Sequence, residues 1–117
     1  MDNDSFTNIT ILDVRSRQEF CSGHLCNALN VSMKVPPWTR AEIEEFKDRL
    51  WKVWHADPGR TYAVYCKLGK RSKIAADILR MFGASVIDLG GTENGPLKPL
   101  FEGKVKRPGY KLCFCKN

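Results

Sequence analysis

The sequence passes from an apolar run through a basic loop to a helical pattern over residues 61–82, which read TYAVYCKLGKRSKIAADILRMF. Residues 61–65 are mostly β-branched or aromatic, which predicts a strand. Residues 66–71 hold a glycine and three basic side chains and are interpreted as a loop. From Ser72, apolar side chains recur at helical spacing as far as Phe82, and the next residue is a glycine suited to end a helix. The stretch therefore predicts a strand, a loop and a helix in succession.

Similar patterns surround this unit. Strands are expected over residues 9–14, 29–31 and 85–89, and helices from Ser16 to before Gly23, over 39–54 and over 97–101. The residue pairs Ser16/Glu19 and Thr39/Glu42 have the spacing of capping boxes. Strands that alternate with helices predict an α/β fold with a central, mostly parallel sheet and helices on both faces. We expect one domain over residues 1–117, in which 92–117 form a C-terminal extension without an assigned structure.

The loop after residue 65 is the expected site, because ligands of parallel sheets bind outside the carboxyl ends of the strands. Cys66 would stand there among backbone N–H groups of the loop and the helix N-terminus, close to Lys67, Lys70 and Arg71. Amide hydrogens and cations favour a thiolate, the nucleophilic form of cysteine. Gly69 allows the backbone to curl around a guest. The alternative interpretation, a buried core thiol, does not explain three adjacent cations.

The segment CKLGKRS, residues 66–72, resembles the active-site loop of rhodanese domains. Upstream, residues 13–15, 19–20, 23–25, 28 and 30–31 are similar to the first motif of that family, and downstream Gly83 and residues 89–91 match its closing motif. The resemblance extends from about Ile9 to Gly91. Asn27 replaces the usual glycine, and residues 92–96 (TENGP) replace a frequent tryptophan.

The resemblance implies a sulfurtransferase in which Cys66 attacks the outer sulfur of a donor such as thiosulfate and forms a persulfide. A thiol, cyanide or a protein acceptor then removes the sulfur. The implied substrate-binding residues are Lys67, Leu68, Gly69, Lys70, Arg71 and Ser72, of which Arg71 would hold the persulfide and the anionic donor. Neither a cofactor nor a metal is implied.

Two other functions are considered. Rhodanese-like phosphatases and arsenate reductases have one more residue between cysteine and arginine, whereas four residues separate Cys66 from Arg71 here. A non-catalytic module that docks an anion or an acidic protein through the basic loop would have no use for the thiol. Sulfur transfer is preferred over both.

Composition indicates an ordinary globular protein, with 43% hydrophobic and 27% charged residues. The net charge of +6 is scattered and not interleaved with aromatic residues, so we expect no nucleic-acid partner. We expect no membrane association either, because no apolar run is long enough to span a bilayer. The acidic start, residues 1–4, does not resemble a secretory signal, which predicts a cytoplasmic protein. Five cysteines, an odd number, predict reduced thiols there.

Several other polar residues are interpreted as structural. His24 is expected to pack and hydrogen-bond, and His55 to face the C-terminal dipole of its helix. Asp13, Arg15 and Glu19 are expected to tie the first strand to its helix through ion pairs.

The remaining four cysteines receive no catalytic role. Cys21 and Cys26 are interpreted as packing residues. Cys113 and Cys115 have the spacing of a short strand with both thiols on one face, and a metal site or a sulfur relay is the alternative.

Overall fold

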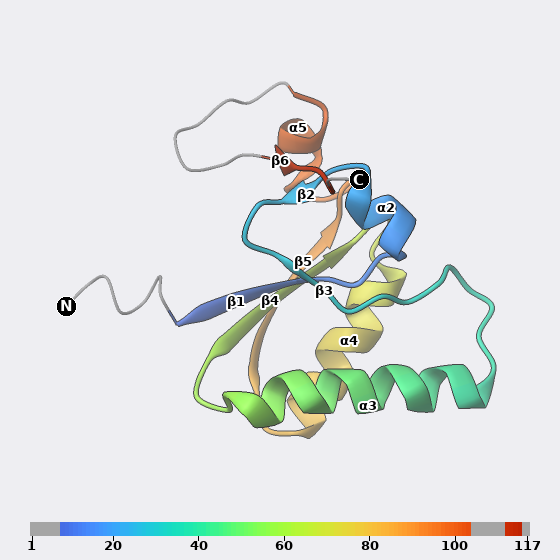
Figure 1. The fold of residues 1–117 in the computed structure, drawn as a ribbon, viewed down its shortest axis with the longest axis vertical. Coiled ribbons are helices and arrows are strands. Elements are labelled where there is room, and N and C mark those ends of the chain that lie inside the picture. The colour runs from blue at the N-terminus through green and yellow to red at the C-terminus, as the bar shows by residue number, and fades with distance from the viewer. Residues whose placement is uncertain (1–7, 104–111, 116–117) are drawn as a thin grey trace.

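The strands of the central sheet all run parallel. The computed structural model describes residues 8–103 and 112–115, and its main sheet has the order β3 (Leu29–Asn30), β1 (Ile9–Asp13), β4 (Thr61–Cys66) and β5 (Ser85–Gly91) (Figure 1). Parallel pairing brings the carboxyl ends of the four strands to one edge. The predicted α/β fold with a central parallel sheet is confirmed.

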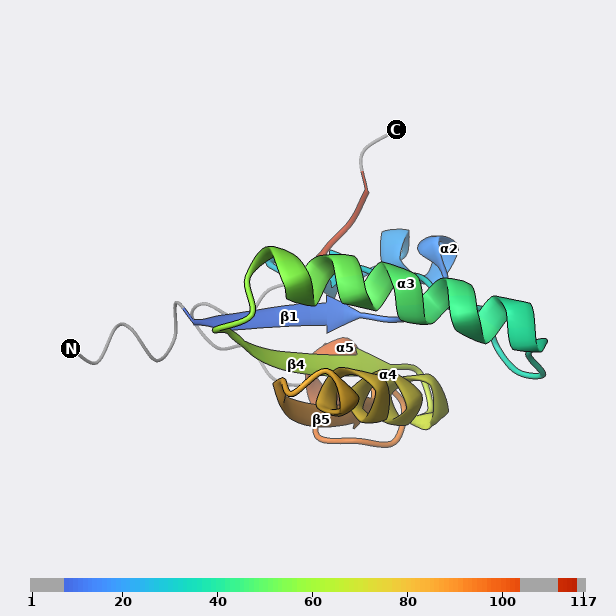
Figure 2. The same ribbon diagram turned by 90° about the horizontal axis from the view of Figure 1, so that it is seen from below.

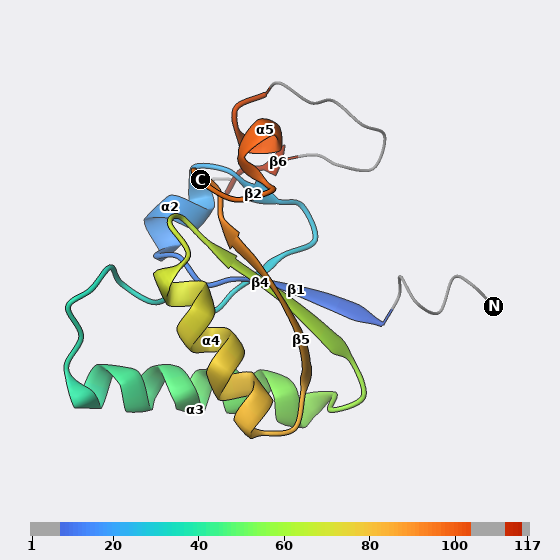
Figure 3. The ribbon, with the colours of Figure 1, turned by 180° about the vertical axis from the view of Figure 1, so that it is seen from behind.

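One face of the sheet packs against the two long helices, α3 (Arg40–Ala56) and α4 (Lys70–Met81). Figure 3 shows α4 lying across β4 and β5, and α3 crossing one end of α4, and Figure 2 gives the view of both helices from below. The core on this face is built from strand residues such as Leu12 and Val64 and helix residues such as Phe46 and Leu79. Cys66 belongs to this cluster.

The opposite face carries two short helices, α2 (Arg17–Cys21) and α5 (Lys98–Phe101). Phe20 and Phe101 from these helices pack around Tyr65 in a second core cluster. Successive strand residues point to opposite faces, so Tyr65 anchors this cluster while its neighbour Cys66 faces the other one. Helices therefore cover both faces, as the alternating pattern predicted.

Local sequence signals place most helix starts. Both predicted capping boxes form, with Ser16 before α2 and Thr39 before α3. The start of α4 differs from the prediction, because the helix begins at Lys70 instead of Ser72. Gly69 adopts φ +101°, which turns the chain into the helix within one residue. Residues 67–69 alone therefore separate β4 from α4.

A second, two-stranded sheet was not predicted. β2 (His24–Leu25) pairs antiparallel with β6 (Leu112–Cys113), which returns from the C-terminal extension. This pairing places the last described residues next to α2 and β2, about ninety positions earlier in the chain.

Two disulfides lock this arrangement. Cys21 is bonded to Cys115 and Cys26 to Cys113, which leaves Cys66 as the free cysteine. The prediction of reduced thiols is therefore wrong for these four residues. The disulfides also correct the packing role of Cys21 and Cys26 and the metal and relay interpretations of Cys113 and Cys115. The short strand expected at these two residues forms in part, as β6, which ends at Cys113. The odd cysteine count misled the prediction because one thiol belongs to the loop after β4 and the other four form pairs.

No helix among residues 8–103 and 112–115 is long and apolar enough to cross a membrane.

Candidate active site

The sulfur of Cys66 accepts two backbone hydrogen bonds. Cys66 is the last residue of β4, and its Sγ lies 3.0 Å from the amide nitrogen of Gly69 and 3.3 Å from that of Ser72. These N–H groups come from the residue before α4 and from its first turn. Donors directed at one atom stabilise negative charge there, so the site is suited to a thiolate or to an anion attached to it.

The loop curls around the sulfur because its residues bond to one another. Gly69 has the left-handed φ that brings its own N–H round to Cys66. The Ser72 hydroxyl donates to the Gly69 carbonyl at 3.1 Å, and the Lys73 amide donates to the same oxygen at 3.0 Å. The start of α4 is therefore tied to the loop that it terminates.

The segment after β5 braces the loop from outside. The amides of Thr92 and Glu93 donate to the carbonyl oxygens of Cys66 and Lys67 at 2.9 and 3.1 Å, and the Asn94 side chain donates to that of Leu68 at 3.1 Å. Because each peptide group is planar, holding its carbonyl also fixes the direction of the N–H across the bond. Sequence reasoning noted residues 92–96 as a departure from the family pattern and missed this role.

Gly91 explains the double glycine of the closing motif. A Cβ atom built on Gly91 would collide with the Lys67 carbonyl oxygen and lie 2.8 Å from the Cα of Leu68. The end of β5 can therefore approach the loop only without a side chain at this position. The glycine was visible in the sequence, but its contact joins segments more than twenty residues apart.

Arg71 is held in place by Glu19 and by the backbone of Met33. Its guanidinium is buried, with two nitrogens 2.7 and 3.1 Å from the two carboxylate oxygens of Glu19 and one 3.0 Å from the carbonyl of Met33. Glu19 was expected to tie its own helix to β1, and instead it joins α2 to α4. The pair anchors the turn of α4 that presents the Ser72 amide to Cys66.

The same pair changes the acidity of Glu19. Burial alone would raise the pKa of this carboxyl, but hydrogen bonds from Arg71 and Ser16 outweigh burial and lower the pKa from 4.5 to about 2. Glu19 is therefore ionised throughout the neutral range and continuously available to Arg71.

The other loop side chains lie at the surface. Lys67, Leu68 and Lys70 are exposed, and Lys67 forms an ion pair of 3.6 Å with Glu93. Cys66 itself is only 1% exposed. Among the six predicted binding residues, the structure brings Gly69 and Ser72 to the sulfur through their backbones.

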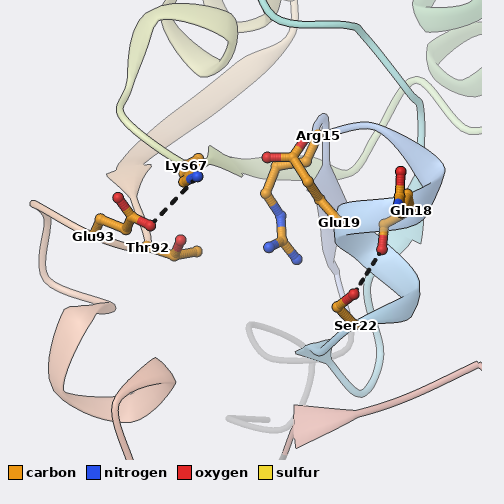
Figure 4. A pocket seen from close by; sticks show the side chains of 7 residues that line it. All are labelled: Arg15, Gln18, Glu19, Ser22, Lys67, Thr92 and Glu93. Carbon is orange, nitrogen blue, oxygen red and sulfur yellow. Dashed lines mark hydrogen bonds and ion pairs between the residues drawn. The ribbon is translucent and has the colours of Figure 1, made fainter.

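A polar pocket of about 310 Å³ adjoins the loop. Figure 4 shows its wall, which combines the loop, the segment after β5, the turn after β1 and α2 with its C-cap. The lining residues are Arg15, Gln18, Glu19, Ser22, Lys67, Thr92 and Glu93. Both signs of charge are present on this wall.

The residues interpreted as structural have structural partners. Nδ1 of His24 lies 2.8 Å from the Phe20 carbonyl oxygen, and its ring stacks on Phe20. Asp13 and Arg15 form the expected ion pair, with an N–O distance of 2.6 Å. His55, in the last turn of α3, stacks on Trp51.

Comparison with known proteins agrees with the fold. A family model described as the rhodanese-like domain matches residues 1–94, and no curated protein matches the chain. A rhodanese-related protein from Thermoplasma volcanium is 28% identical, with a TM-score of 0.60 over 95% of this chain and 89% of its own. A rhodanese with anions from E. coli is 26% identical, with a TM-score of 0.56 over 75% of this chain and 92% of its own.

A third solved structure supports the fold alone. Protein HP1203 from Helicobacter pylori 26695 is 20% identical, with a TM-score of 0.63 over 93% of this chain and 81% of its own. Together, the comparisons support a module of the sulfurtransferase or anion-binding type.

Proposed function

The chain belongs to the rhodanese-like domain family, and on that premise we propose that it is a sulfurtransferase that carries a sulfane sulfur on Cys66. The observation that carries this proposal is the pair of N–H groups, from Gly69 and Ser72, directed at Sγ of Cys66. A docking module would need the amides but not the sulfur between them.

In the first half-reaction, the thiolate of Cys66 attacks the outer sulfur of an anionic donor such as thiosulfate. A new S–S bond forms, the donor's own S–S bond breaks, and sulfite leaves with the bonding electron pair. The product is a persulfide anion on Cys66. The loop amides stabilise the charge that remains at the site.

In the second half-reaction, a thiol or cyanide attacks the outer persulfide sulfur and releases the Cys66 thiolate. Atoms and electrons balance over the two steps, so no cofactor is needed. We assign Arg71 a positioning role, because its guanidinium is already held by Glu19 and the Met33 carbonyl. Lys67 and Lys70 would attract the anionic donor from the surface.

Intact-mass measurement tests the proposal. After incubation with thiosulfate, the wild-type protein should gain one sulfur atom and lose it on addition of cyanide. The Cys66→Ser variant retains all four disulfide cysteines and therefore reports any reaction of cyanide or thiosulfate with those bonds. A wild-type protein that gains no sulfur would reject the catalytic proposal in favour of a non-catalytic anion-binding module.

We also infer that the domain works in an oxidising compartment, which would replace the expected cytoplasmic location. Structural disulfides persist in oxidising surroundings and are rare in the cytosol, and this chain carries two. Cys66 has no cysteine partner and would remain available for sulfur transfer there.

A further inference from the structure

Arg15 is a buried cation at the wall of the pocket beside the Cys66 loop. The residue is 7% exposed, and its guanidinium lies 5.6 Å from the ring centre of Tyr65 and 5.5 Å from that of Phe101. Nε and Nη2 donate to the carboxylate of Asp13, and Nη2 also donates to the Gly23 carbonyl at 2.7 Å. These contacts hold the guanidinium in one orientation.

One nitrogen of this guanidinium has spare hydrogen-bonding capacity. Nη1 of Arg15 donates to no atom of the described residues, whereas the other two nitrogens are engaged. Figure 4 shows the guanidinium pointing into the pocket between Thr92 and Ser22. Nη1 is open to solvent, so its N–H groups can donate to the acceptor atoms of a ligand in the pocket.

The pocket indicates the class of ligand. Its volume of about 310 Å³ is much larger than a small inorganic oxyanion requires and reaches the lower end of small-molecule sites, roughly 300–1,000 Å³. The hydroxyl of Ser22, the amide of Gln18 and the ion pair between Lys67 and Glu93 offer further polar contacts. An organic molecule with an anionic end and a reactive end would use this space.

We propose that Arg15 binds the carboxylate of a low-molecular-weight thiol that accepts sulfur from Cys66. This inference rests on the proposed function, because only a persulfide on Cys66 gives such a thiol a reaction. The acceptor thiolate attacks the outer persulfide sulfur, the S–S bond to Cys66 breaks, and the Cys66 thiolate leaves. Lys67, which follows Cys66 directly, lines the pocket, so the pocket lies beside the Cys66 loop.

The first test uses the wild-type protein and two thiols. Protein loaded with one sulfur is mixed with 3-mercaptopropionate or with neutral 2-mercaptoethanol, and loss of the sulfur is followed by intact mass after alkylation, which also shows whether the disulfides survive. The rate constants are divided by the fraction of each thiol present as thiolate. We expect the carboxylated thiol to react about tenfold faster. Equal rates would overturn the proposal.

A second test changes the charge of the pocket without touching Arg15. Gln18 is exposed and lines the pocket, so Gln18→Glu adds a negative charge without disturbing the core. We expect this variant to reduce the advantage of 3-mercaptopropionate about threefold. Asn8→Asp adds the same charge just before β1, at the other end of the sheet, and should leave the advantage unchanged. Equal effects of the two substitutions would contradict the proposal.

Measuring sulfur loading and sulfur discharge separately distinguishes failure of the proposed function from failure of the Arg15 site. A protein that takes no sulfur from thiosulfate lacks the proposed activity. A protein that loads normally but does not distinguish the thiols has the activity without the Arg15 site. If Gln18→Glu slows loading by thiosulfate and leaves discharge unchanged, Nη1 of Arg15 binds the donor's sulfonate oxygens, and the acceptor assignment is wrong.

Discussion

Glu19 and Arg71 join two helices that are 52 residues apart in the sequence. The carboxylate of Glu19 receives hydrogen bonds of 2.7 and 3.1 Å from the guanidinium of Arg71, whose side chain is only 4% exposed. Arg71 immediately precedes Ser72, which donates its backbone N–H to Cys66. A side-chain contact between α2 and α4 thereby fixes a main-chain donor at the sulfur.

Glu19→Gln should weaken both stability and activity. The variant leaves a buried guanidinium without its counter-ion, and because Glu19 is partly exposed we expect a loss of about 2 kcal/mol in the free energy of unfolding at pH 7. The rate of sulfur loading should fall severalfold as the Ser72 amide loses its support. Urea denaturation and intact-mass kinetics measure the two effects. Glu44→Gln, on the exposed surface of α3, is the control and should change neither.

The same ion pair predicts how stability depends on pH. The folded-state pKa of Glu19, about 2, lies below its usual 4.5, so the unfolded chain binds the proton more readily. The contribution of Glu19 is complete above pH 4.5 and is lost as the pH falls through 2. The difference in unfolding free energy between the wild type and Glu19→Gln should therefore shrink from pH 5 to pH 2. A difference that stays constant over this range would show that the carboxylate charge is not responsible.

Gly91→Ala should disrupt the loop from outside. The added methyl group would collide with the Lys67 carbonyl, and overpacking of this kind costs about 1–3 kcal/mol. Because Lys67 and Leu68 must shift, we expect sulfur loading to fall more than tenfold. Gly59→Ala is the matched control, since a Cβ there meets no atom within 4 Å. A wild-type rate of sulfur loading in Gly91→Ala would show that the close approach of β5 to the Cys66 loop does not control the reactivity of the sulfur.

Contacts between residues close together in the sequence were the ones predicted correctly. The capping boxes of Ser16 and Thr39 involve residues three positions apart, and both were predicted correctly. The position of Cys66 followed from the rule that parallel strands carry sites at their carboxyl ends. Glu19 and Arg71, in contrast, meet only after the sheet has formed, so their spacing in the sequence carries no signal of the contact.

The C-terminal cysteines illustrate the same limit more sharply. Cys113 reaches Cys26 only because β6 pairs with β2, and the sequence separation of 87 residues gives no indication of that pairing. An odd count predicts reduced thiols in a cytoplasmic protein, but a catalytic cysteine added to two disulfides also gives an odd number. Counting cysteines becomes informative only when the reactive one is first set aside.

Labelling of free thiols in the denatured protein tests the disulfides. Denatured protein treated with iodoacetamide without reductant should take up one label, at Cys66, and five after reduction. Uptake of five labels without reductant would show that neither disulfide is present and would contradict the proposed oxidising compartment. The Cys21–Cys115 bond closes a loop of 94 residues, for which the chain-entropy model gives about 4–5 kcal/mol.

The stability lost when one disulfide is removed should depend on whether the other disulfide is still present. Once Cys21 and Cys115 are joined, the bond between Cys26 and Cys113 closes only the short remaining ring, so it removes much less chain entropy. We therefore expect Cys26→Ser/Cys113→Ser and Cys21→Ser/Cys115→Ser each to lower the melting temperature modestly, and the fourfold variant to lower it by more than the sum. If the fourfold variant lowers the melting temperature only by the sum of the two double variants, the cross-links stabilise the folded state locally and not by restricting the unfolded chain.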